Sequence, residues 1–114
     1  MRSAVDRYVS MQKREALMYA SAAIASGYQV RVNYGDGDWG TDMTDSLYEV
    51  RKALFACDEE WLVVYKNGQR VGWFFFVYGN EPGVVVNDYH IAMEPIYQAC
   101  EAKRAKFEDM RDPR

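Results

Sequence analysis

Asn67 and Gly68 separate two runs of β-forming residues and predict the turn of a β-hairpin. The flanking runs, 61–66 and 70–78, are rich in aromatic and β-branched side chains. Asn-Gly is the strongest short-range hairpin signal, because both residues tolerate the positive φ of a two-residue type I′ turn. We therefore expect two antiparallel strands here, and the rest of the fold must accommodate them.

The second run carries large apolar side chains on both of its faces. Successive residues of a strand point to opposite sides. The two sets are Trp73, Phe75 and Val77 on one face, and Phe74, Phe76 and Tyr78 on the other. Either helices cover both faces, or one face stays available for a partner. For the second case we take Phe74, Phe76 and Tyr78 as candidate partner-contacting residues.

Three segments show helical periodicity. Apolar residues recur at three- and four-residue steps in residues 3–26, from about 44 to 57, and from 94 to about 110. Gly27 would cap the C-terminus of the first helix, and Thr44 or Asp45 the N-terminus of the second. Pro95 suits the first turn of the third helix.

Three further strands complete the predicted fold. Apolar and polar residues alternate over residues 28–34, a short return strand is expected around 38–43, and another strand over 84–89. The predicted order is α-β-β-α-β-β-β-α, which places the chain in the α+β class. We expect a single globular domain, residues 1–114, with an antiparallel sheet of about five strands and three helices.

Gly35, Gly37 and Gly40 have the G-x-G-x-x-G spacing of dinucleotide-binding loops. In such loops the second glycine opens a helix, whose free N–H groups bind the pyrophosphate. Here no helix is expected before about Thr44, and the neighbouring carboxylates would repel phosphate. We therefore interpret residues 35–37 as a hairpin turn and expect no cofactor.

Asp36, Asp38 and Asp42 surround this turn and give it an acidic tip beside Trp39. The spacing begins like a calcium loop but lacks that template's fifth, sixth and twelfth residues, so we expect no metal. A loose cation site and simple solvated carboxylates are the two alternatives. We predict that the three aspartates and Trp39 contact a partner, with charge speeding encounter and the indole slowing release.

No catalytic signature is evident elsewhere. Asp88 and His90, the chain's one histidine, would share a strand face as a base and its orienting carboxylate, or His90 is merely an edge-strand residue. Cys57 and Cys100 fall on the apolar stripes of predicted helices, where buried, unreactive cysteine is the default. We expect no catalytic residues, no zinc site and a reducing compartment.

Charge is concentrated in the middle of the chain. The net charge is only -3, but residues 27–60 hold eight carboxylates and three basic side chains. A nucleic-acid-binding protein would need a basic face, and only the first 26 residues offer a hint of one. No apolar run approaches the ~18 residues of a membrane span, so we expect neither a membrane partner nor export.

A set of hairpin and turn residues runs through residues 27–90. It consists of Gly27-Tyr28-x-Val30, Asp36-Gly37, Asp58-x-x-x-Leu62-x-Val64-Tyr65, Arg70-Val71-Gly72-Trp73, Val77-Tyr78-Gly79-Asn80 and Asp88-Tyr89. This set resembles small accessory proteins encoded by tailed bacteriophages. The resemblance implies a viral protein that acts in the bacterial host cytoplasm, against a host-defence system or another host machine.

The expected function is therefore non-enzymatic. We predict that the protein binds a bacterial host protein complex, such as a CRISPR or restriction complex, and inhibits or redirects it through an acidic and aromatic surface. The alternatives are a nucleic-acid-binding module that uses the first helix and exposed aromatic residues, and a small hydrolase built on Asp88 and His90. The sequence does not indicate an oligomeric state.

Overall fold

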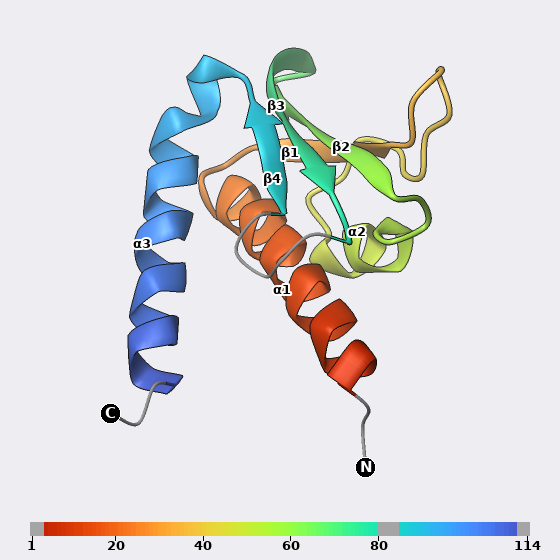
Figure 1. Cartoon of the computed structure of the whole chain (residues 1–114). Coiled ribbons are helices and arrows are strands. Elements are labelled where there is room, and N and C mark those ends of the chain that lie inside the picture. Colours follow the sequence, from red (N-terminus) through yellow and green to blue (C-terminus); the bar gives the residue numbers. More distant parts are fainter. Residues whose placement is uncertain (1–3, 80–84, 112–114) are drawn as a thin grey trace.

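The computed structural model describes residues 4–79 and 85–111, with side chains described for 9–79 and 85–105. In this part of the chain, α-helices and antiparallel strands form two layers (Figure 1). In chain order the elements are α1 (Ala4–Ala25), β1 (Gln29–Asn33), α2 (Leu47–Ala53), β2 (Glu59–Lys66), β3 (Gln69–Val77), β4 (Val86–Tyr89), the 3-10 helix η1 (Ile91–Met93) and α3 (Glu94–Arg111). The predicted α+β class and the three helices are confirmed.

The sheet has four strands in the order β1-β2-β3-β4, and every neighbouring pair is antiparallel. Asn67 and Gly68 join β2 to β3 with φ values of 52° and 79°, as a type I′ turn requires. The hairpin prediction is therefore confirmed. Residue 84 of the predicted strand 84–89 lies outside the described residues.

The predicted return strand at 38–43 is wrong. Trp39 and Thr44 form only isolated bridges with β1, opposite Asn33 and Val30. Between them the Thr41 hydroxyl accepts the Val32 N–H at 3.1 Å, so a side chain occupies the place of a backbone carbonyl. This interrupts the ladder, and the observed order becomes α-β-α-β-β-β-α.

Helix α2 is shorter than predicted. Its N-cap is Ser46, whose Oγ accepts the Glu49 N–H at 3.4 Å, and not Thr44 or Asp45. Thr44 is instead paired with β1, because it exchanges both backbone hydrogen bonds with Val30. The helix ends at Ala53, well before Cys57. Cys57 is consequently exposed, so the prediction that it is buried is wrong.

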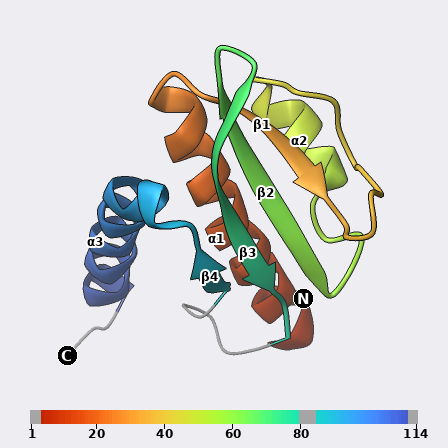
Figure 2. The same ribbon diagram turned by 90° about the horizontal axis from the view of Figure 1, so that it is seen from above.

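The core lies between the helices and one face of the sheet. All three helices lie on the same side, with α1 crossing beneath the strands between α2 and α3 (Figures 1 and 2). Tyr19 of α1 contacts Phe74 and Phe76 of β3, with ring centroids 5.2 and 6.1 Å apart. Both phenylalanines are fully buried. Strand β3 is thus covered by helices on one face only.

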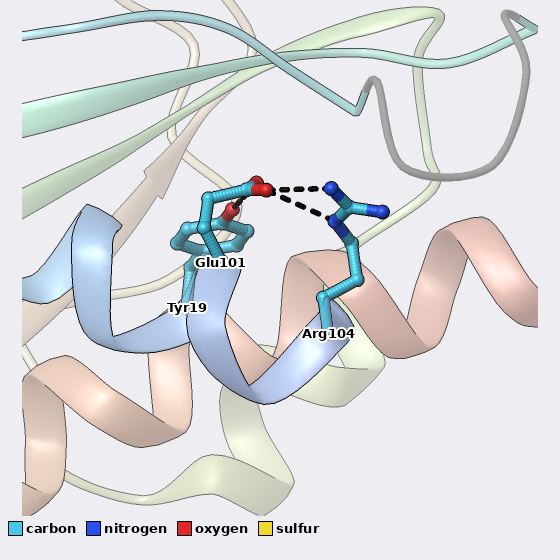
Figure 3. A network of polar contacts seen from close by, with 3 residues as sticks. All are labelled: Tyr19, Glu101 and Arg104. Atoms are coloured by element: carbon cyan, nitrogen blue, oxygen red, sulfur yellow. Dashed lines mark hydrogen bonds and ion pairs between the residues drawn. The ribbon is translucent and has the colours of Figure 1, made fainter. Parts of the chain in front are cut away.

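A polar network fixes α3 against α1 (Figure 3). The Tyr19 hydroxyl donates to Glu101 at 2.9 Å, and Arg104 forms a 2.7 Å ion pair with the same carboxylate. At the other end of α3 the Tyr89 hydroxyl donates to Glu94, which raises the pKa of Tyr89 to about 12.

No helix in the described ranges is long and apolar enough to cross a membrane.

Candidate binding surface

The sheet face opposite the helices carries a layer of aromatic side chains. Figure 2 looks onto this face, with α1 behind the strands. The pleat and the strand register assign it the following residues, which we call the open face: Gln29, Arg31, Asn33, Glu59, Trp61, Val63, Tyr65, Arg70, Trp73, Phe75, Val77 and Asp88. In the described part of the chain no helix covers this face.

Two aromatic rings of the open face stack on one another. Trp61 and Phe75 are cross-strand neighbours, and their rings stack with centroids 4.5 Å apart and an interplanar angle of 24°. Val63, between Arg31 and Trp73 in the register, is only 2% exposed. Trp61, Trp73 and Phe75 remain partly exposed. The open face is therefore a thin apolar layer with its rings still accessible to a partner.

The loop between β1 and α2 borders the open face. The Arg31 guanidinium lies 3.8 Å from the centroid of the Trp39 ring, and its Nε donates to the Thr41 carbonyl at 3.1 Å. A Cβ at Gly35 would lie 3.4 Å from the Trp61 ring, so the start of the loop touches the indole. Trp39 is partly buried by this packing and holds the loop in place.

The tip of the loop is a tight turn, as predicted. The Asp38 N–H donates to the Gly35 carbonyl at 2.9 Å, and the Tyr34 N–H donates to the Asp38 carbonyl at 2.7 Å. Helix α2 begins only at Leu47, so none of the three glycines opens a helix. Asp36, Asp38 and Asp42 are all exposed. In the described residues, no group of three or more His, Cys, Asp or Glu side chains is arranged to hold a metal ion.

Three of the candidate contact residues on β3 and beyond it belong to the fold itself. Phe74 and Phe76 are 0% exposed, so their assignment as partner-contacting residues is wrong. The Tyr78 hydroxyl donates to Glu60 at 2.8 Å, and its ring stacks on Phe55 at 3.9 Å, which engages the side chain at both ends. The accessible aromatic residues are those of the opposite parity.

Both edges of the sheet are occupied by the chain's own groups. At β1, Val30 and Thr44 exchange backbone hydrogen bonds of 2.8 and 2.9 Å. At β4, the register is irregular, and the Tyr89 N–H donates to its neighbour Asp88 Oδ1 at 2.8 Å. Such devices oppose pairing with an added strand. They favour the open face over the sheet edges as the contact surface.

His90 and Asp88 each bind nearby backbone groups. His90 Nδ1 accepts the Ala92 N–H at 3.1 Å and so caps η1, while Asp88 Oδ1 is engaged by the Tyr89 N–H. The His90 ring meets the Trp73 ring edge-on at 6.3 Å. In the structure, His90 therefore caps η1 at the end of an edge strand, and the Asp88 side chain accepts from the neighbouring backbone.

Comparisons of the chain with protein-family models, with curated proteins and with solved structures found no match.

Proposed function

We propose that the protein is a non-enzymatic binding protein that inhibits or redirects a bacterial host protein complex by direct contact through the open face. The observation that carries this proposal is the partly exposed aromatic layer of Trp61, Trp73 and Phe75. Aromatic side chains in a packed patch are the residue types that dominate binding energy in protein interfaces. The other face of the sheet is covered by helices, and both of its edges are occupied by the chain's own groups.

The rigidity of the patch supports the same function. Its aromatic residues project from paired strands, and its loop is anchored by the contact between Arg31 and Trp39. A surface that is ordered before binding loses less conformational entropy when a partner binds. The open face is therefore preorganised for contact in a way that a mobile loop is not.

The host setting of the proposal comes from the resemblance to accessory proteins of tailed phages. Under this proposal the protein acts in the host cytoplasm, and a CRISPR or restriction complex is the type of target. Such a complex holds nucleic acid with Lys and Arg side chains. The carboxylates of Asp36 and Asp38, beside the open face, would attract the same basic surface.

A nucleic-acid-binding function is the second candidate, and one observation favours it. Accessible aromatic residues on an antiparallel sheet are a platform on which unpaired bases stack. Arg31 and Arg70 lie on this face, but Glu59 and Asp88 lie there too. Because phosphate contact requires a surplus of basic groups, protein binding remains the better-supported function.

Affinity capture with matched variants tests the proposal. Trp73→Ala removes an open-face ring, and Tyr48→Ala removes a side chain that is 67% exposed on α2, in the helical layer. We expect the wild type and Tyr48→Ala to capture the same bacterial complex in similar amounts. Trp73→Ala should capture at least ~10-fold less of it. Circular dichroism would establish that both variants fold.

Two results would contradict the proposal. Equal capture by Trp73→Ala and the wild type would exclude the open face as the contact surface. Binding of single-stranded oligonucleotides that weakens steeply with salt, measured by fluorescence anisotropy, would favour the second candidate instead.

A further inference from the structure

We infer that the open face binds a cationic side chain of its partner, an arginine within a basic segment, between the Phe75 ring and the Asp88 carboxylate. The inference rests on the proposed function and names the chemistry of the partner. It depends on the register of three strands, on the stacking of one ring pair and on the distribution of charge along the sheet.

The ring pair directs the outer face of Phe75 toward Asp88. Trp61, Phe75 and Asp88 occupy one row across β2, β3 and β4. Because the Trp61 and Phe75 rings stack along this row, the second face of the Phe75 ring is turned toward β4. Cross-strand neighbours have Cβ atoms about 5 Å apart, so Asp88 lies next to that ring face, with its carboxylate held by the Tyr89 N–H on the outer side of β4.

The Asp88 carboxylate can accept further hydrogen bonds in this position. Its side chain is exposed, and Oδ1 accepts the Tyr89 N–H at 2.8 Å. This hydrogen bond uses Oδ1 alone, and a carboxylate oxygen can only accept. The complementary ligand is a donor that also tolerates an aromatic surface, which describes a cation better than a neutral group.

Charge is separated along the strands of the open face. Glu59, opposite Val77, and Asp88 lie at the end where β1 leads into the acidic loop tip. Arg70, opposite Tyr65, lies at the other end, and Arg31 is already stacked on Trp39. The acidic end therefore presents aromatic rings and carboxylates together, the combination that is complementary to a basic segment.

Arginine fits this site better than lysine. Its planar guanidinium can stack on the Phe75 ring while two N–H groups point to one carboxylate, whereas an ammonium group is a compact, strongly hydrated charge. The protein itself contains such a contact, since the Arg31 guanidinium lies 3.8 Å from the centroid of the Trp39 ring. The partner would repeat that stacking at the acidic end of the face.

An arginine peptide and its uncharged analogue test the inference. The probes are a capped Gly-Arg-Gly-Arg-Gly peptide and the same peptide with citrulline, which keeps the shape but loses the charge. We expect the arginine peptide to shift the backbone amide resonances of Phe75 and Asp88. The citrulline peptide should bind at least ~5-fold more weakly.

The protein offers a conservative variant and a matched control. Asp88→Asn keeps an oxygen for the Tyr89 N–H but removes the charge, and should weaken the arginine peptide at least ~5-fold. Glu49→Gln removes a half-exposed carboxylate from α2 and should leave binding unchanged. Equal binding of both peptides, shifts confined to other residues, or no peptide binding would overturn the inference.

The same variants separate this inference from the proposed function. If Trp73→Ala loses the bacterial complex while Asp88→Asn captures it as the wild type does, the cationic site is excluded and the binding function stands. If both variants capture it fully, the proposed function fails as well. A concentration-dependent dimer that protects Phe75 and excludes the peptide would identify a second copy as the occupant and overturn the inference.

Discussion

The Glu60 carboxylate accepts a hydrogen bond of 2.8 Å from the Tyr78 hydroxyl, at the point where β2 begins and β3 ends. Glu60 is fully buried. It also accepts the backbone N–H groups of Phe55, Ala56 and Cys57 at 2.9, 2.8 and 3.2 Å. The Glu60 side chain thus accepts the backbone N–H groups of the turn that follows α2, in which Phe55 adopts a φ of 72°. This turn sets the start of β2, and Trp61 of the open face follows immediately.

Glu60→Gln should lower the free energy of unfolding by about 2–4 kcal/mol. Both Glu60 oxygens accept from donors, so the glutamine NH₂ group must face at least one N–H that it cannot accept. Urea denaturation measures the effect. The exposed neighbour provides the control, because Glu59→Gln should change stability by less than ~0.5 kcal/mol. Equal losses in the two variants would mean that the buried carboxylate has no special role.

The protein should lose stability in alkali. Burial, together with Glu101 and Glu60 respectively, raises the pKa values of Tyr19 and Tyr78 above their ordinary value of 10.0. A group whose folded pKa exceeds its unfolded pKa stabilises the protein fully below the unfolded value, and that contribution is lost as the pH rises toward the folded value. Urea midpoints should therefore be steady to about pH 9 and fall above pH 10. In Tyr19→Phe the fall should be shallower, and an identical pH profile would contradict the assignment.

The two cysteines should differ in their reactivity toward iodoacetamide. Cys57 is exposed, whereas Cys100 is 3% exposed and burial raises its pKa to about 11. Since the thiolate is the reacting species, Cys100 should be protected at about pH 8. Peptide mass spectrometry should find rapid modification at Cys57, and modification at Cys100 only after unfolding in denaturant. Rapid labelling of both thiols in the folded protein would contradict the packing of α3.

The sequence predicts the hairpin and the fold class because these depend on local chemistry. Asn67 and Gly68 specify their turn without help from distant residues. The two faces of Trp73–Tyr78 are a different case, because both are apolar and a period of two cannot rank them. The position of α1 decides that Phe74 and Phe76 are buried and that Phe75 is accessible.

The limits of sequence-based prediction are similar at the predicted strand 38–43 and at Glu60. The predicted strand at 38–43 is wrong because the Thr41 hydroxyl, and not a backbone carbonyl, accepts the Val32 N–H. The periodicity of the sequence does not reveal that a side chain takes this place. Glu60 stands between Glu59 and Trp61 with nothing to distinguish it from a solvated carboxylate. Its burial follows from the path of the chain after α2, which only the three-dimensional structure shows.

The acidic loop tip offers a prediction that separates stability from binding. Asp36 and Asp38 are exposed, and Asp36 has a φ of 52°, a conformation that asparagine tolerates well. The double variant Asp36→Asn with Asp38→Asn should therefore change the free energy of unfolding by less than ~1 kcal/mol. If the tip attracts a basic target, target binding should weaken about 3–10-fold at low ionic strength, chiefly through slower association.

The salt dependence identifies the cause of that loss. Exposed charges are screened over about 8 Å at physiological ionic strength, so the difference between the double variant and the wild type should shrink as salt is added. Surface plasmon resonance against the captured complex measures both rates, and Glu49→Gln, which removes one carboxylate from α2, again serves as the control for charge lost away from the tip. If the double variant associates as fast as the wild type at low salt, the tip plays no part in recognition. Contact would then be confined to the open face, where Trp61, Trp73 and Phe75 would supply the binding energy.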